Sequence, residues 1–245
     1  ALDRPLRQFG QPLHEVRGRE PRPVRFGVSL RLGDPASVAP VTDRLRAYGE
    51  VEFKLDAEPS WDQQLIGVLA ATAAIRVIDF KGAYRGTGVD VSTDPELYRR
   101  CALAFPDAYL EDPDLDSPLA EAALRDHRDR ITWDVPVLAT ADVSTLPFEP
   151  TALNSKPSRL GGLESLFDFY DYCEEHGIAL YGGGQAELGP GRGQAQLLAS
   201  LFHPEAPNDL APLGWDRGDF HRTGLLASPL PPAPAAPGFR GRWLS

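Results

Sequence analysis

Short apolar runs alternate along this chain with longer stretches of mixed polarity. The runs begin 17 to 33 residues apart and are Val24–Leu30, Val51–Leu55, Ile75–Phe80, Ala108–Glu111, Val135–Ala139, Ala152–Asn154 and Ile178–Tyr181. This spacing is typical of a strand, a crossover helix and the next parallel strand. The pattern therefore predicts a series of β/α units.

The stretches between the runs carry helical signals. An N-cap and a first-turn proline, Asp94 and Pro95, come directly before one of them, and Gly177 ends another. Helices are predicted over Asp62–Ala74, Glu96–Phe105, Leu163–Cys173 and Gln194–Phe202.

Repeated units of this kind build either a closed barrel or an open parallel sheet. An open sheet would favour a glycine-rich turn after the first strand, and Ser29–Gly33 has no dinucleotide-binding fingerprint. A barrel is therefore the predicted fold, with a weakly marked eighth strand around Asn208–Ala211.

Composition excludes several classes of protein. The 25 basic residues against 35 acidic ones give a net charge of −10, which disfavours a nucleic-acid surface. No stretch approaches the roughly 20 apolar residues of a membrane span, and no amino-terminal segment resembles a signal peptide. Two cysteines are too few for a disulfide scaffold. We expect a cytoplasmic protein that has no membrane segment and binds no nucleic acid.

Charged and amide side chains follow the predicted strands. In a parallel barrel the carboxyl ends of the strands surround one mouth, where the chemistry takes place. The residues at these ends are Lys54, Asp56, Asp79, Lys81, Glu111, Asp142, Asn154, Lys156 and, beyond the last strand, Glu187. Residues two apart point to the same side of a strand, so these side chains are expected to converge.

Three carboxylates on consecutive strands, Asp79, Glu111 and Asp142, would suit a hard cation such as Mg²⁺. Lysines that face such an ion can act as acid or base. The chemistry that this set suggests is proton abstraction next to a carboxylate, with the metal stabilising the enediolate. The substrate would then be a small carboxylate.

At these positions the chain resembles the enolase superfamily, particularly its muconate-lactonizing and o-succinylbenzoate-synthase branches. The resemblance covers about residues 1 to 215. It is carried by six segments in order, which are 51–56 (VEFKLD), 78–82 (IDFKG), 110–113 (LEDP), 135–142 (VPVLATAD), 154–162 (NSKPSRLGG) and 181–187 (YGGGQAE). Any one of these segments is a weak signal, whereas six in order are specific.

The resemblance implies a modified TIM barrel of the (β/α)7β type at 24–215. It also implies that residues 1–23 are the last helix of a capping domain otherwise absent from this chain. Composition separately predicts a proline- and glycine-rich tail at 216–245. Asp79, Glu111 and Asp142 would be the Mg²⁺ ligands, and Lys156 an acid/base or a cationic partner. Self-association is common among such relatives, so a homo-oligomer is also expected.

Three positions depart from the family pattern. Asp56 replaces the second lysine of the Lys-x-Lys segment, Lys81 replaces an asparagine, and Val143 replaces a glutamate. An ammonium and a divalent ion repel each other in a partly desolvated pocket. Lys81 could therefore replace the metal by pairing with the acids, or it could turn outward and act as the missing base.

Two hypotheses follow for the mouth. In the first, the chain is a lyase or isomerase in which Lys156, Lys54 and Lys81 are catalytic, and Asp56, Asn154, Gly183 and Glu187 bind substrate. The glycine-rich segment 182–193 could hold an anion at the start of the next helix. In the second, the barrel is metal-independent or non-catalytic and binds a small ligand or partner.

Overall fold

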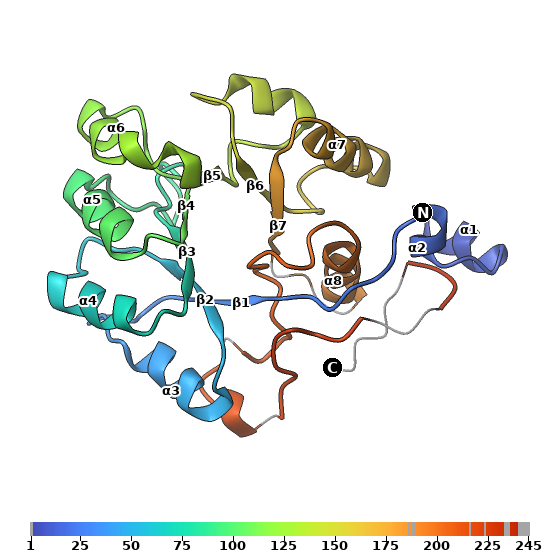
Figure 1. Ribbon diagram of the computed structural model, residues 1–245, viewed down its shortest axis with the longest axis horizontal. Helices are drawn as coiled ribbons and strands as arrows, with labels where there is room; N and C mark the ends of the chain where they lie inside the picture. Colours follow the sequence, from blue (N-terminus) through green and yellow to red (C-terminus); the bar gives the residue numbers. More distant parts are fainter. Residues whose placement is uncertain are drawn as a thin grey trace.

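Seven parallel strands form one curled sheet in the computed structural model, which describes residues 2–185, 187, 190–215, 217–222, 224–232 and 236–239 (Figure 1). The strands pair in chain order and are β1 (Gly27–Leu30), β2 (Glu52–Asp56), β3 (Ile75–Asp79), β4 (Tyr109–Glu111), β5 (Ile131–Trp133), β6 (Ala152–Ser155) and β7 (Ala179–Gly182). The predicted (β/α) barrel is confirmed.

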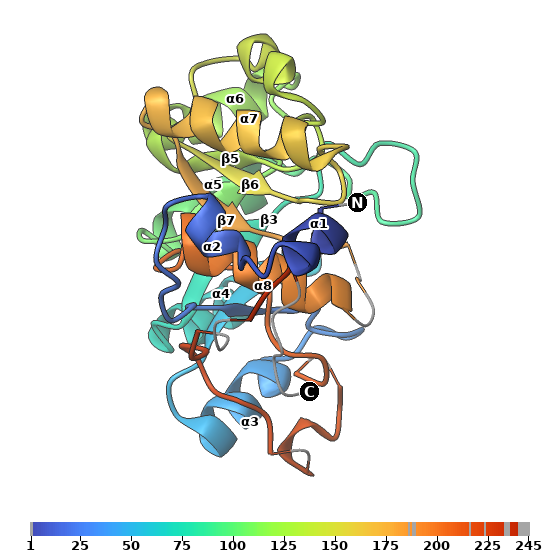
Figure 2. The same ribbon diagram turned by 90° about the vertical axis from the view of Figure 1, so that its right-hand side faces the viewer.

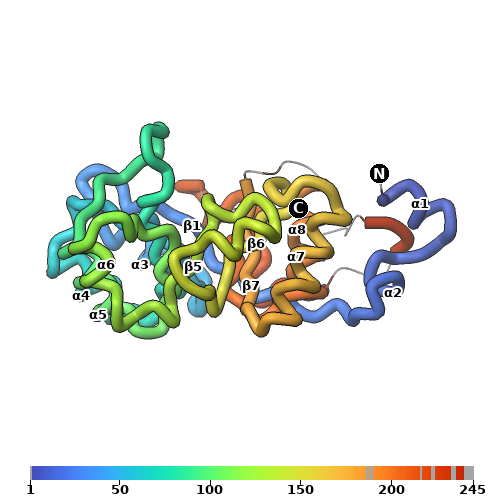
Figure 3. The backbone as a smooth tube through the Cα atoms, turned by 90° about the horizontal axis from the view of Figure 1, so that it is seen from above, coloured from blue at the N-terminus to red at the C-terminus, as the bar shows by residue number. Residues whose placement is uncertain are grey.

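Helices cover the outside of this sheet (Figures 1 and 3). They are α3 (Ala39–Tyr48), α4 (Gln63–Ala71), α5 (Pro95–Ala104), α6 (Pro118–Leu124), α7 (Leu163–Glu175) and α8 (Pro190–Phe202). Asp62 and Asp94 accept hydrogen bonds from backbone N–H groups in the first turns of α4 and α5, and the sequence predicts the cap at Asp94. Short 3₁₀ turns occur at Arg125–Arg130, Thr140–Thr145 and Phe220–Arg222.

The register of the sheet places acidic residues side by side. Asp56 pairs with Asp79 across β2 and β3, and Asp79 pairs with Glu111 across β3 and β4. Because parallel strands all run the same way, their carboxyl ends lie at one edge. The sheet therefore gathers these three carboxylates at the mouth.

The predicted eighth strand is reduced to a short connection that closes the gap between β7 and β1. The Gly27 N–H donates to the carbonyl of Asn208 over 2.8 Å, and the Asp209 N–H donates to the carbonyl of Gly182 over 2.7 Å. The side chain of Asn208 adds a hydrogen bond from the Gly182 N–H. Asn208 thus connects the first and last strands.

One predicted strand is wrong in position. The sequence favours a strand over Val135–Ala139, whereas the structure places β5 at Ile131–Trp133 and an irregular segment after it. Pro136 lacks the N–H that a central strand must donate, and Ile131 and Thr132 are β-branched. This shift moves the end of β5 from Asp142 to Asp134.

Residues 2–23 contain α1 (Asp3–Gln8) and α2 (Leu13–Val16), which lie beyond α8 (Figures 1 and 2). The described part of the C-terminal region packs back on the barrel, since Leu230 pairs with Val24 and is fully buried. The domain boundaries at residues 23 and 215 stay a prediction, and part of the predicted tail lies outside the described residues. No helix in the described ranges is long and apolar enough to cross a membrane.

Candidate active site at the carboxyl ends of the strands

Lys54, at the end of β2, is surrounded by carboxylates. Its side chain is 2% exposed, and its Nζ lies 3.1 Å from Asp79 Oδ2 and 3.9 Å from Asp209 Oδ2. Nζ also forms an ion pair with Glu111. Lys54 therefore links the ends of three neighbouring strands through one ammonium group.

Lys81 follows β3 and contacts two acids. Its Nζ is paired with Asp79 and lies 3.2 Å from Asp56 Oδ1. The backbone of Lys81 has a φ of 55°, which is uncommon for a residue with a side chain, and its N–H donates to Asp79 Oδ1 over 3.0 Å. Asp79 thus holds both the backbone and the ammonium of Lys81.

Burial and charge act in opposite directions on these groups. Burial by itself would raise the pKa of Asp79, but Lys54 and Lys81 hold that pKa well below its usual range. Burial would lower the pKa of Lys54, and the carboxylates of Glu111 and Asp79 instead raise it well above its usual value. Lys54 and Asp79 are therefore charged near neutral pH.

Glu111, at the end of β4, lies in the barrel interior. Asn154 Nδ2 donates to Glu111 Oε2 over 3.2 Å, and the hydroxyl of Tyr181 donates to the same oxygen. Burial raises the pKa of Glu111, and the nearby carboxylate of Asp79 adds to the rise, whereas the ion pair with Lys54 lowers it. Glu111 is thus fixed by groups from β2, β6 and β7.

Asp134, directly after β5, is the centre of a second cluster. It is paired with Lys156 and with Arg159, and the hydroxyl of Tyr84 donates to its Oδ2 over 3.1 Å. Tyr84 reaches it from the loop between β3 and α5, which projects from the body of the molecule in Figure 2. Asp112 accepts the N–H groups of Asp134 and Val135 at 2.9 and 3.0 Å.

The lysines of this chain are confined to the mouth. The sequence contains three lysines and 22 arginines among its 25 basic residues. The side chains of Lys54, Lys81 and Lys156 are 2%, 12% and 8% exposed, respectively. All other cationic side chains are arginines, so the mouth differs chemically from the rest of the protein.

The other expected substrate-binding residues lie around the mouth. Asp56 accepts a hydrogen bond from Arg31 Nε over 3.0 Å, in addition to pairing with Lys81. A Cβ on Gly183 would lie 2.4 Å from Asn154 Oδ1, so the backbone passes very close to that side chain. Glu187 accepts the Gln185 N–H over 2.7 Å.

Asp142 does not join these residues. It lies in a 3₁₀ turn, where its Oδ2 accepts the N–H groups of Leu138 and Ala139 at 2.9 and 2.8 Å. The acid that follows β5 at the mouth is Asp134. The sequence pattern predicts the fifth strand four residues too late and therefore indicates Asp142 in its place. The available signal was the Ile131–Trp133 run immediately before Asp134.

Three buried carboxylates are close enough to share a metal ion. Among the described residues, the group of three or more potential metal ligands within 4.8 Å of one another is Glu111, Asp112 and Asp134. Every oxygen of these three already accepts a hydrogen bond or ion pair, from Lys54, Asn154, Tyr181, Lys156, Arg159, Tyr84 or backbone N–H groups. In this arrangement the residues do not fit a divalent cation, because the lysine ammonium groups hold the oxygens that it would need.

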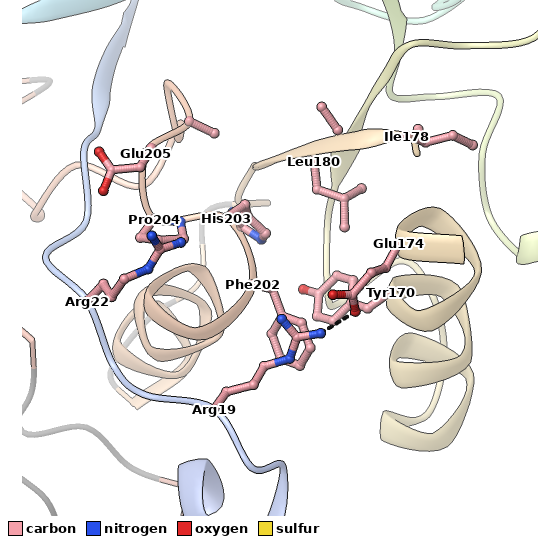
Figure 4. Close-up of a pocket in the computed structure, with 12 residues that line it drawn as sticks. Arg19, Arg22, Tyr170, Glu174, Ile178, Leu180, Phe202, His203, Pro204 and Glu205 are labelled. Atoms are coloured by element: carbon pink, nitrogen blue, oxygen red, sulfur yellow. Dashed lines mark hydrogen bonds and ion pairs between the residues drawn. The ribbon is translucent and has the colours of Figure 1, made fainter. Parts of the chain in front are cut away.

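A cavity of about 320 Å³ lies at the opposite end of the barrel, near the start of β7 (Figure 4). Arg19, Glu174, Phe202 and His203 are among the residues that line it, and Arg19 is paired with Glu174. It contains none of the residues expected from sequence to act at the mouth. The candidate chemistry therefore stays with the mouth.

A family model matches most of this chain. The model, described as the C-terminal domain of a domain of unknown function, DUF8230, matches residues 20–217.

Curated relatives have enzymatic names. An N-succinylamino acid racemase of an Amycolatopsis species is 28% identical over 243 residues, which is 95% of this chain and 62% of the relative. An o-succinylbenzoate synthase of Geobacillus stearothermophilus is 26% identical, over 86% of this chain and 57% of the relative. This chain therefore spans about three fifths of the length of these relatives.

Solved structures share the fold. An enolase-superfamily protein of Listeria innocua superposes with a TM-score of 0.73 at 20% identity, over 97% of this chain and 64% of that one. A dipeptide epimerase of Methylococcus capsulatus, complexed with an Mg ion, superposes with a TM-score of 0.69 at 20% identity, over 97% and 70% of the two chains. The predicted resemblance to the enolase superfamily is confirmed in the fold.

Proposed function

This chain belongs to the DUF8230 C-terminal domain family, and we propose that its mouth binds a small carboxylate and moves a proton at the adjacent carbon, as a lyase or isomerase. The observation that carries the proposal is the cluster of buried lysines and carboxylates at the ends of β2 to β6. The racemase and synthase names of the relatives support it.

Lys156 is the proposed acid/base. Its partner Asp134 is also bound by Arg159 and Tyr84, so the carboxylate would keep a counter-ion when Lys156 gives up its proton to solvent. A neutral Lys156 takes the proton from the carbon, and the electron pair of the broken C–H bond moves into the carboxylate to form an enediolate. Return of a proton to the opposite face of that carbon inverts its configuration and completes an isomerisation. Departure of a β-substituent from the enediolate completes an elimination instead.

Asp56 has a different role from the base that its position would suggest. Arg31 and Lys81 both bind its carboxylate, so it orients Lys81. The mouth thus offers one base, Lys156, with Lys54 and Lys81 as fixed cations. Asn154 and Tyr181 hold Glu111, and Gly183 leaves space beside Lys156.

An Mg²⁺-assisted form of this reaction is the alternative within the same function. The Mg ion in the solved dipeptide epimerase motivates it, and it requires the lysine ammonium groups to leave the oxygens of Glu111 and Asp134. The predicted homo-oligomer and the predicted cytoplasmic location stay predictions.

Deuterium exchange tests the proposed function. Dipeptides, N-succinylamino acids, acid sugars and cyclohexadiene carboxylates are incubated with the protein in D₂O, and incorporation next to the carboxylate is followed by NMR. Lys156→Ala should reduce incorporation by about 100-fold or more. Lys156→Arg is the matched variant, because it keeps the charge but does not release a proton, and it should be equally impaired.

Incorporation by Lys156→Ala at the rate of the unmodified protein would contradict the role of Lys156. Binding of a panel carboxylate with no exchange would favour the second candidate, a barrel that binds a ligand or partner without catalysis. That candidate is motivated by the ion pairs of Lys81 and by Asp56 in place of a lysine.

A further inference from the structure

We propose that the ammonium groups of Lys54 and Lys81 take the place of the divalent cation expected of this fold, so that the mouth binds a carboxylate ligand without metal. The replacement of the cation rests on the contacts of the described side chains. The choice of a carboxylate as ligand rests on the function proposed above.

Lys54 lies where the divalent cation would be expected. Its Nζ touches Asp79 and Glu111 together, the two expected metal ligands that the structure does bring to the mouth. Asp209, on the connection that closes the barrel, lies 3.9 Å from the same nitrogen. One ammonium thus lies among carboxylates from three parts of the chain, as a metal ion would.

Lys81 is held against the same carboxylate, Asp79, by its backbone and by Asp56. The left-handed backbone of Lys81 and its N–H bond to Asp79 turn the side chain back over the same carboxylate. Asp56, on β2, also fixes this ammonium, with its Oδ1 3.2 Å from Lys81 Nζ. Two single positive charges therefore surround Asp79, and together they match the charge of one divalent ion.

Lysine, the residue type of both cations, is rare in this chain. The chain uses arginine at 22 of its 25 basic positions, and its three lysines all lie at the mouth. An ammonium is a compact point charge, whereas a guanidinium is a planar fork that needs more room. Only lysine can place a positive charge of nearly ionic size between closely spaced carboxylates.

Lys81 is also the more accessible of these two cations. Its side chain is 12% exposed, compared with 2% for Lys54, and the Tyr84 ring lies 5.0 Å from its Nζ. A carboxylate ligand would therefore meet Lys81 first, below the loop that carries Tyr84. In this arrangement Lys54 neutralises the buried acids, and Lys81 faces the ligand.

Calorimetric titration of Mg²⁺ and Mn²⁺ into the intact chain tests the replacement. The unmodified protein should show no binding at millimolar metal, and Lys81→Asn should gain it by at least tenfold in affinity. Asparagine tolerates the left-handed backbone at this position, so the fold should be retained, which circular dichroism checks. Arg85→Asn is the matched control, because it also removes a cation from this loop. Arg85 pairs with Asp114 and Asp116 and contacts neither Asp79 nor Asp56 in these ion pairs.

The second measurement uses succinate as the probe, in the presence of a chelator. The unmodified protein and Arg85→Asn should bind succinate, and Lys81→Asn should bind it at least tenfold more weakly. Metal binding by the unmodified protein, a folded Lys81→Asn with no gain in metal affinity, or succinate binding that needs added metal would each overturn the inference. Neither measurement needs turnover. A failed deuterium-exchange assay would therefore contradict the proposed proton transfer without affecting the results on metal and succinate binding.

Discussion

Gly183 is a residue at which the mouth has little space. A Cβ there would lie 2.4 Å from Asn154 Oδ1 and 2.8 Å from Lys156 Cε. Both neighbours are buried and held by other groups, so neither can move freely. The close approach of the backbone explains the glycine, and it links this position to Lys156.

Gly183→Ala should therefore lower the free energy of unfolding by about 1–3 kcal/mol, because the added methyl overpacks the mouth. Gly67→Ala is the matched control: Gly67 lies within α4, a Cβ there would meet nothing within 4 Å, and alanine should raise the free energy by up to about 1 kcal/mol. Urea unfolding measures both. Equal effects of the two substitutions would contradict the packing argument.

His203 is a buried histidine held in its neutral form. Its Nδ1–H donates a hydrogen bond of 2.6 Å to Asn208 Oδ1, and its Nε2 is buried without a hydrogen-bond partner among the described residues. Burial lowers the pKa of His203 to about 4, although Asn208 opposes the shift. The unfolded chain therefore binds a proton below about pH 6.5 that the folded chain does not bind until about pH 4.

The stability contributed by neutral His203 should be complete above about pH 6.5 and should decrease as the pH falls toward 4. The decrease should reach about 3 kcal/mol, the difference between the two pKa values expressed as free energy. Urea unfolding between pH 4 and 7 checks this for the unmodified protein and for His203→Gln, which lacks the titrating ring. The same pH dependence in both proteins would assign the effect to the carboxylates.

At the scale of elements, Asn208 completes the barrel that β1 and β7 leave open. Its side chain accepts the Gly182 N–H and donates to the carbonyls of Arg25, His203 and Ala206. The backbone carbonyl of Asn208 accepts the Gly27 N–H. One amide side chain therefore replaces much of the hydrogen bonding of a full eighth strand.

Asn208→Ala should lower the free energy of unfolding by about 2–4 kcal/mol, because several buried polar groups lose their partners together. Hydrogen exchange should show faster exchange at Gly182, whose N–H bonds to the lost side chain. The control is Ser144→Ala, which removes one exposed hydrogen bond to a backbone carbonyl in a 3₁₀ turn. Unchanged exchange at Gly182 would mean that the backbone contacts suffice to close the barrel.

At the scale of the whole molecule, the interior is balanced by charges that come from distant parts of the chain. Lys54 from β2 neutralises acids on β3 and β4, and Lys156 after β6 pairs with Asp134 after β5. Removing one partner of a buried pair leaves an uncompensated charge in a poorly solvated place. The folded barrel and its charge network therefore depend on each other.

Lys54→Met should lower the free energy of unfolding by about 3–5 kcal/mol for this reason. Adding Glu111→Gln should recover part of the loss, because one of the stranded charges disappears. Arg46→Met, which removes an exposed pair with Asp43, should cost less than about 1 kcal/mol. A Lys54→Met protein as stable as the Arg46→Met control would show that solvent reaches the acids of the interior.

The sequence by itself determined the order of the elements and most of the groups at the mouth. Apolar runs at regular spacing placed six of the seven strands, since buried parallel strands must be apolar whichever partners they have. The residues directly after those strands had to meet at one edge. Lys54, Asp56, Asp79, Lys81, Glu111, Asn154 and Lys156 are brought there as the spacing implied.

Tertiary structure decided the partners of those groups. Pro136 is a local signal against a strand at Val135–Ala139, but only the hydrogen bonds of Ile131–Trp133 to β4 and β6 decide that Asp134 follows the fifth strand. The same holds for Lys81, whose ammonium lies on Asp79 and Asp56 because the backbone turns at that residue. Charge and spacing can be counted along a chain, but which charge neutralises which depends on distances of a few ångströms that only the folded barrel sets.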